Sequence, residues 1–164
     1  MLNSFFAGAR EKGEKIYFAV DPLLLRDRQD TYEKLIEYEA FALFYDTQLN
    51  AYMDKSPLLV GVLPNSPLFS TLRQSNTYEK GIFISSSLKL HHLAKHLQQY
   101  MFKNRYDGEL MLLRIYDPYV MYDFEILFLD KEEQTAFFSG ISAILYAAPD
   151  RRVYTRTIRG AKYE

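Results

Sequence analysis

The window that most restricts the fold is residues 107–121, where a turn dipeptide, an apolar run and a helix start follow one another directly. Asp107-Gly108 is typical of a turn. The run 110–116 does not alternate apolar with polar residues, as a strand with one solvated face would. We therefore expect a central strand that is covered on both faces. Asp117-Pro118 then predicts a helix start, because the carboxylate accepts free backbone N–H groups and proline presets φ.

Arg114 is the charged residue inside this apolar run. An unpaired guanidinium buried there would be strongly destabilising. Three placements are compatible with the sequence: the side chain pairs with a carboxylate, reaches the edge of the sheet, or is completed by a binding partner. The sequence does not choose among them.

Other apolar runs alternate with helical patterns along the chain. Strands are expected at 15–20, 41–45, 57–63, 81–85, 141–147 and 153–158, and helices at 31–38, 49–54, 67–74, 88–104, 120–129 and 131–138. Ser66 and Asp130 are expected to be the N-caps of the helices at 67–74 and 131–138. This alternation predicts an α/β fold: a three-layer sandwich with a mixed, partly parallel central sheet, and a C-terminal β-hairpin at one edge. The 164 residues suffice for one domain, 1–164, with a lead-in at 1–14 and a basic hairpin and tail at 148–164.

Composition excludes several classes of protein. The chain has no cysteine, so it lacks disulfides and thiolate metal sites. No apolar run approaches the ~20 residues of a membrane span, and residues 1–15 lack the apolar core of a signal peptide, so we expect a cytoplasmic protein without a membrane partner. Residues 151–164 carry a net charge of +4 and the first 150 residues −5, which argues against nucleic-acid binding by the whole domain.

Three aspartates, Asp21, Asp46 and Asp117, each follow a predicted strand. Carboxylates at strand ends are where α/β enzymes place metal-binding or acid–base groups, so a small metal-dependent hydrolase is one interpretation. The other is that Asp21 and Asp117, each followed by proline, cap helices. We favour capping, because it alone explains the Asp-Pro pairs.

Two histidines, His92 and His96, have the i, i+4 spacing of a zinc site on a helix. The glutamate that a zinc protease needs after the first histidine is replaced by Leu93, so a solvated helix face is the preferred interpretation. Residues 85–87 are serines without the flanking glycines of a nucleophile elbow, which favours turn or cap roles. We expect neither a metal nor a cofactor.

Short motifs spread along the chain resemble, in order and spacing, the adaptor family of bacterial type VI secretion, called Tap or TEC adaptors. They are Phe18–Pro22, Phe44-Tyr45-Asp46, Pro57–Val60, Ser66-Pro67-Leu68, the turn at Ser85, His96-Leu97, Asp107-Gly108, Arg114–Pro118 and Phe137–Gly140. Two positions depart from the family pattern: Lys80-Gly81 stands where Trp-Gly is usual, and Tyr119 stands where an arginine is usual.

The resemblance implies a protein that is not an enzyme. It implies a cytoplasmic chaperone that binds a secreted toxin effector and promotes its loading onto the VgrG spike. We expect Arg114, Tyr116, Asp117 and Pro118, with Asp21 and His96, to form the protein-binding motif or its support. An immunity-type toxin-binding protein and the small hydrolase remain as alternatives.

Overall fold

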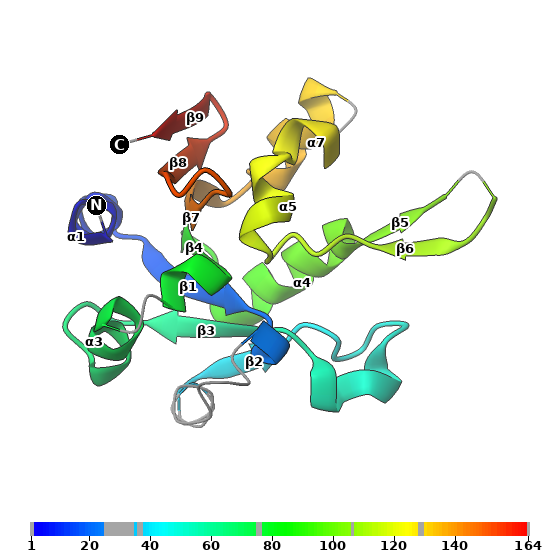
Figure 1. The fold of residues 1–164 in the computed structure, drawn as a ribbon, viewed down its shortest axis with the longest axis horizontal. Helices are drawn as coiled ribbons and strands as arrows, with labels where there is room; N and C mark the ends of the chain where they lie inside the picture. The colour runs from blue at the N-terminus through cyan, green and yellow to red at the C-terminus, as the bar shows by residue number, and fades with distance from the viewer. Residues whose placement is uncertain are drawn as a thin grey trace.

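The computed structural model describes residues 2–24, 35, 38–74, 77–105, 107–127 and 130–163 (Figure 1). The chain forms a mixed α/β fold in which helices lie on both faces of one large sheet. In the part that is described, no helix is both long enough and apolar enough to cross a membrane.

The described residues form a seven-stranded sheet with the order β2-β3-β1-β4-β7-β8-β9. Its strands are β1 Lys15–Val20, β2 Ala40–Ala42, β3 Leu58–Val62, β4 Gly81–Ser86, β7 Ile141–Ala147, β8 Val153–Thr157 and β9 Gly160–Tyr163. Every neighbouring pair is antiparallel, so the predicted partly parallel sheet is wrong. Strand β1 lies between β3 and β4, so these two strands, which follow one another along the chain, are not neighbours in the sheet. An apolar run indicates that a strand is buried on both faces, but it does not indicate whether the neighbouring strand is parallel or antiparallel.

Two apolar cores lie on opposite faces of the sheet, because successive side chains of a strand point to opposite faces. In β1, Phe18 and Val20 enter one core, and Tyr17 and Ala19 enter the other. The first core is covered by α1 Leu2–Glu11 and α3 Pro67–Gln74. The second is covered by α4 Leu90–Met101, α5 Pro118–Tyr122, α6 Phe124–Leu127 and α7 Lys131–Phe137. Two short 3-10 helices, η2 Asn50–Lys55 and η3 Thr77–Lys80, complete the elements.

The predicted central strand at 110–116 is wrong. Only β6 Leu110–Leu112 is a strand, and it pairs with β5 Phe102–Asn104 in a separate two-stranded ribbon that projects from the body (Figure 1). Leu110 is 45% and Met111 40% exposed, so this part of the run is not covered. The chain then turns through residues 113–117, where Ile115 and Tyr116 are buried in the core beneath α4 and α5. The apolar run 110–116 therefore comprises two different structures, an exposed ribbon strand at 110–112 and a buried turn at 115–116.

Several local predictions are confirmed. Ser66 and Asp130 cap α3 and α7, accepting backbone N–H groups at 3.1 and 2.8 Å. The antiparallel hairpin of β7 and β8 is also confirmed, although β9 was not predicted. The lead-in at 1–14 is largely the helix α1. The predicted helix 31–38 falls mostly outside the described residues.

The C-terminal basic segment has one buried arginine, although Arg151, Arg152 and Arg159 are exposed. The side chain of Arg156 is buried, and its guanidinium lies 4.8 Å from the ring centroid of Phe124. Its Nε also donates to the hydroxyl of Tyr146 at 3.4 Å. Arg156 therefore belongs to the packing between β8 and the helical layer.

Candidate functional site

Arg114 joins two bends of the chain that are far apart in sequence. Its guanidinium Nη2 lies 3.0 Å from Oδ2 of Asp21, at the end of β1, and 3.3 Å from Oδ2 of Asp117, at the start of α5. Of the three placements open for Arg114, pairing with carboxylates is the one observed. We call Arg114, Asp21, Asp117 and the adjacent Tyr116 the Arg114 cluster.

Each aspartate of the cluster uses its second oxygen to organise the residues that follow. Oδ1 of Asp21 accepts the backbone N–H of Leu23 at 2.8 Å, and Oδ1 of Asp117 accepts that of Tyr119 at 2.9 Å. Asp117 is the N-cap of α5, and Pro118 follows it in the first turn. The capping interpretation of the Asp-Pro pairs is therefore confirmed. Both carboxylates combine a backbone cap with an ion pair.

Burial makes the cluster more than a surface ion pair. The side chains of Asp21 and Asp117 are only 8% and 14% exposed, whereas that of Arg114 is 41% exposed. The Nε atom of Arg114 is buried and makes no hydrogen bond to any residue that is described. The aspartates are thus largely shielded from water and depend on the guanidinium for charge compensation.

Tyr116 is buried and packs against the guanidinium of Arg114. The distance from Cζ of Arg114 to the centroid of the Tyr116 ring is 5.9 Å. Burial and, to a lesser extent, the negative charge of Asp21 raise the pKa of Tyr116 to about 12, while Arg114 opposes the shift. Tyr116 is therefore uncharged at neutral pH, and its ring supports the ion pairs.

Exposed apolar side chains lie next to both capped bends. Leu23 and Leu24 follow Asp21, and Tyr119 and Tyr122 follow Asp117; all four are exposed, Tyr119 most of all at 61%. Because Arg114 holds the two bends together, it also fixes where these side chains are presented. The arrangement is suited to contact with another macromolecule, for which aromatic and aliphatic side chains on a rigid support are typical.

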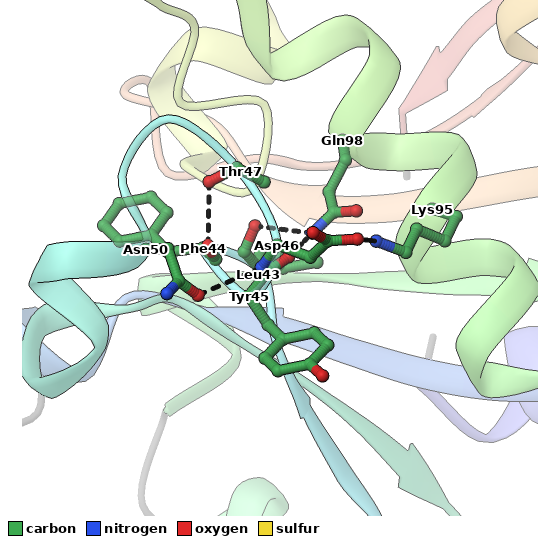
Figure 2. Close-up of polar contacts among 8 residues, drawn as sticks. All are labelled: Leu43, Phe44, Tyr45, Asp46, Thr47, Asn50, Lys95 and Gln98. Atoms are coloured by element: carbon green, nitrogen blue, oxygen red, sulfur yellow. Dashed lines mark hydrogen bonds and ion pairs between the residues drawn. The ribbon is translucent and has the colours of Figure 1, made fainter.

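Asp46 does not join Asp21 and Asp117 at Arg114. It lies in the turn after β2, has φ 57°, and pairs with Lys95 of α4 at 3.0 Å (Figure 2). Its backbone N–H donates to Oδ1 of Asn50 at 3.1 Å. In the described ranges, no group of three His, Cys, Asp or Glu side chains could hold a metal ion.

Gln98 is a structural residue of this region that the sequence interpretation missed. Its side chain is buried, and the amide donates to the carbonyl oxygens of Leu43 at 3.0 Å and Tyr45 at 2.8 Å (Figure 2). A signal was present: Gln98 lies four residues after Ala94, on the apolar face of α4. A polar side chain on a buried helix face requires a partner, and here it fixes the Asp46 turn.

His96 is separate from the Arg114 cluster in its contacts. Its Nε2 lies 2.7 Å from the carbonyl oxygen of Phe137, at the end of α7, so this nitrogen carries the proton and donates. The ring also contacts Tyr100 and Phe137. The prediction of a solvated helix face holds for His92, which is exposed, but is wrong for His96, which is half-buried and joins α4 to α7.

Fold and site together define a mixed α/β domain with an antiparallel sheet, in which aspartates at bends of the chain form structural ion pairs. Residues 16–136 match the family model described as a domain of unknown function (DUF4123), and the chain belongs to this family. The match covers the sheet through β4, the Arg114 cluster and most of α7. Comparison with curated proteins and with solved structures gives no match.

Proposed function

We propose that the chain is a non-enzymatic adaptor that binds a secreted toxin effector of type VI secretion and promotes its loading onto the VgrG spike in the cytoplasm. The family match supports this proposal together with the resemblance of the Arg114–Pro118 motif to such adaptors. The observation that carries it is the Arg114 cluster, in which the aspartates that a hydrolase would use are engaged in caps and ion pairs.

In this role the cluster is a support and the neighbouring apolar side chains make the contact. Leu23 and Tyr119 are exposed and are each attached to a capped bend, so little conformational entropy is lost when they bind. A tyrosine has a large contact area and few rotatable bonds, which makes Tyr119 the candidate contact residue.

The test is co-expression with the product of the adjacent open reading frame, followed by affinity capture and a binding titration. Tyr119→Ala should weaken capture about tenfold or more, as truncation of a central interface tyrosine does. Tyr52→Ala is the matched control, because Tyr52 is equally a surface tyrosine, in η2. Equal capture by both variants would show that this surface is not the contact.

Two further measurements separate the alternatives. Saturable binding of Mg²⁺ or Mn²⁺ in a calorimetric titration, abolished by Asp117→Asn, would favour a metal-dependent hydrolase over an adaptor. Deletion of the gene in the native host should stop export of the effector. Self-intoxication on deletion would instead indicate an immunity-type protein.

A further inference from the structure

A cavity of about 630 Å³ opens at one end of the sheet, where α1 ends, β1 begins, β3 ends and α4 begins. This volume is within the range of sites that bind small organic molecules. None of its lining residues belongs to the Arg114 cluster, so it is a second feature of the molecule that the adaptor role does not use.

The wall of the cavity is mainly apolar. Phe6 and Ala9 of α1, Ile16 of β1 and Leu90 of α4 line it, and all four are buried. Leu63 lies at the end of β3 and is 73% exposed, the largest exposed fraction among the large apolar side chains that are described. An apolar ligand body would therefore remove both wall and rim surface from water.

The charges around the cavity favour an anion. Arg10, Lys15 and Lys89 line it, are exposed, and make no ion pair with any residue in the described ranges. The acidic lining residues are Glu14 and Glu39, which leaves one net positive charge. Exposed cations that lack partners can neutralise a bound anion without first losing an internal ion pair.

Glu14 makes no ion pair with these cations in the described ranges. Its carboxylate accepts hydrogen bonds from the hydroxyl of Ser85 on β4, at 2.5 Å, and from that of Ser142 on β7. Both oxygens of Glu14 are thus engaged with the sheet. The carboxylate ties the α1–β1 turn to β4 and β7.

The start of α4 adds to the positive field at the rim. Lys89 is the N-cap of this twelve-residue helix and makes no side-chain hydrogen bond to its first turn. The N-terminal end of a helix carries a partial positive charge from its free N–H groups. This end adjoins the cavity through Lys89 and Leu90.

We propose that this cavity binds an amphipathic anion, with an apolar body against the α1 and β1 wall and one acidic group at the rim among Arg10, Lys15 and Lys89. The chemical class is a carboxylate attached to an apolar body. The proposal goes beyond the adaptor role and does not depend on it, because ligand binding at this cavity is measured without an effector or spike protein.

Two fluorescent probes of nearly the same shape test the charge requirement: anilinonaphthalene sulfonate and its uncharged analogue, phenylnaphthylamine. Lys89→Glu and Arg10→Glu should each weaken binding of the sulfonate about tenfold, because a charge reversal removes one attraction and adds one repulsion. Binding of the uncharged probe should change by less than about twofold. Lys55→Glu is the control, since Lys55 is exposed and does not line the cavity. Equal loss of both probes, or no loss of the sulfonate, would overturn the proposal.

A second pair of variants tests the location without altering charge. Gly61 lies in the cavity wall, and a Cβ there would meet nothing nearer than the carbonyl oxygen of Glu39 at 4.0 Å. Gly61→Leu should therefore fold and reduce binding of both probes. Gly8→Leu adds the same side chain in open space on α1, outside the lining, and should leave both affinities unchanged. Unchanged binding in Gly61→Leu contradicts the assigned location.

Competition identifies the natural source of the carboxylate. Octanoate and an acetylated leucyl-phenylalanine peptide with a free C-terminus should each be titrated against the bound sulfonate probe, with the peptide amide as the neutral control. Displacement by octanoate alone assigns a fatty acid, and displacement by the free peptide but not its amide assigns a peptide C-terminus. Failure of both carboxylates to displace the probe overturns the proposal.

Discussion

The replacement of Arg114 by methionine is the sharpest test of the Arg114 cluster. Methionine retains much of the apolar stem of arginine and removes the guanidinium, so the change isolates the ion pairs from packing. The variant leaves two carboxylates, each less than a sixth exposed, without their cation. We therefore expect a large loss of stability with the fold retained.

The magnitude follows from burial. Breaking a fully buried ion pair costs about 3–5 kcal/mol, because one charge remains buried and uncompensated. Here the side chain of Arg114 is 41% exposed, and both aspartates keep a backbone N–H donor. Solvent near the guanidinium weakens the interaction, so we expect Arg114→Met to lower the free energy of unfolding by about 2–3 kcal/mol.

Urea unfolding at pH 7 measures this loss, followed by circular dichroism and by tyrosine fluorescence, since the chain has no tryptophan. A loss of that size should move the unfolding midpoint down by about 1–2 M urea. The double variant Arg114→Met with Asp21→Asn should recover part of the loss, giving a coupling free energy of about 1–2 kcal/mol in a double-mutant cycle.

Lys95→Met is the matched control. Lys95 also forms a 3.0 Å pair with an aspartate, but the side chain of Asp46 is 76% exposed. This surface pair should contribute less than about 1 kcal/mol. If Arg114→Met and Lys95→Met have the same small effect, the argument that burial gives the Arg114 cluster its structural role is refuted.

Three further predictions concern single side chains. The pKa of Tyr116 is raised to about 12, so the neutral phenol contributes to stability below about pH 10, and this contribution is lost as the pH rises toward 12. Urea unfolding across this pH range should show a loss of about 1–2 kcal/mol in the free energy of unfolding, after allowance for solvent. Tyr116→Phe should not show this loss. Gly81→Ala should destabilise by about 2–4 kcal/mol in thermal unfolding, because a Cβ would lie 2.4 Å from the carbonyl oxygen of Ala19, whereas Gly8→Ala in open space should not. Gln98→Ala should cost about 1–3 kcal/mol by removing two buried hydrogen bonds, and faster amide exchange in residues 43–50 should accompany it.

Helix and turn caps were predictable, because each depends on one side chain and on the backbone N–H groups two or three residues further along the chain. The Asp-Pro pairs at 21 and 117 and the caps at Ser66 and Asp130 follow from side-chain reach alone, and all four accept the expected N–H groups. The pairing of Arg114 with a carboxylate was among the predicted options. One partner, Asp117, lies only three residues further along the chain, but the contact with Asp21 spans 93 positions of sequence, and no local pattern contains that information.

The sheet was less predictable, because an apolar run constrains exposure and not pairing. The runs of β1, β3 and β4 were located, yet their antiparallel order arises because β1 is inserted between β3 and β4. The run at 110–116 serves two environments, an exposed ribbon and a buried turn, and its composition alone could not separate them. The cavity at the end of the sheet likewise has no motif, since its residues come from four separate segments.

The position of the Arg114 cluster explains why a polar contact is used there. Residues 87–140 form one long excursion between β4 and β7, which are adjacent in the sheet, and this excursion carries the projecting ribbon and α4–α7. Apolar packing against the sheet is non-directional and would allow the excursion to slide. The hydrogen bond from Arg114 to Asp21 is directional, and it attaches the midpoint of this excursion to the end of β1. Substitutions at Arg114 should therefore alter the orientation of Tyr119 relative to Leu23 before they unfold the sheet.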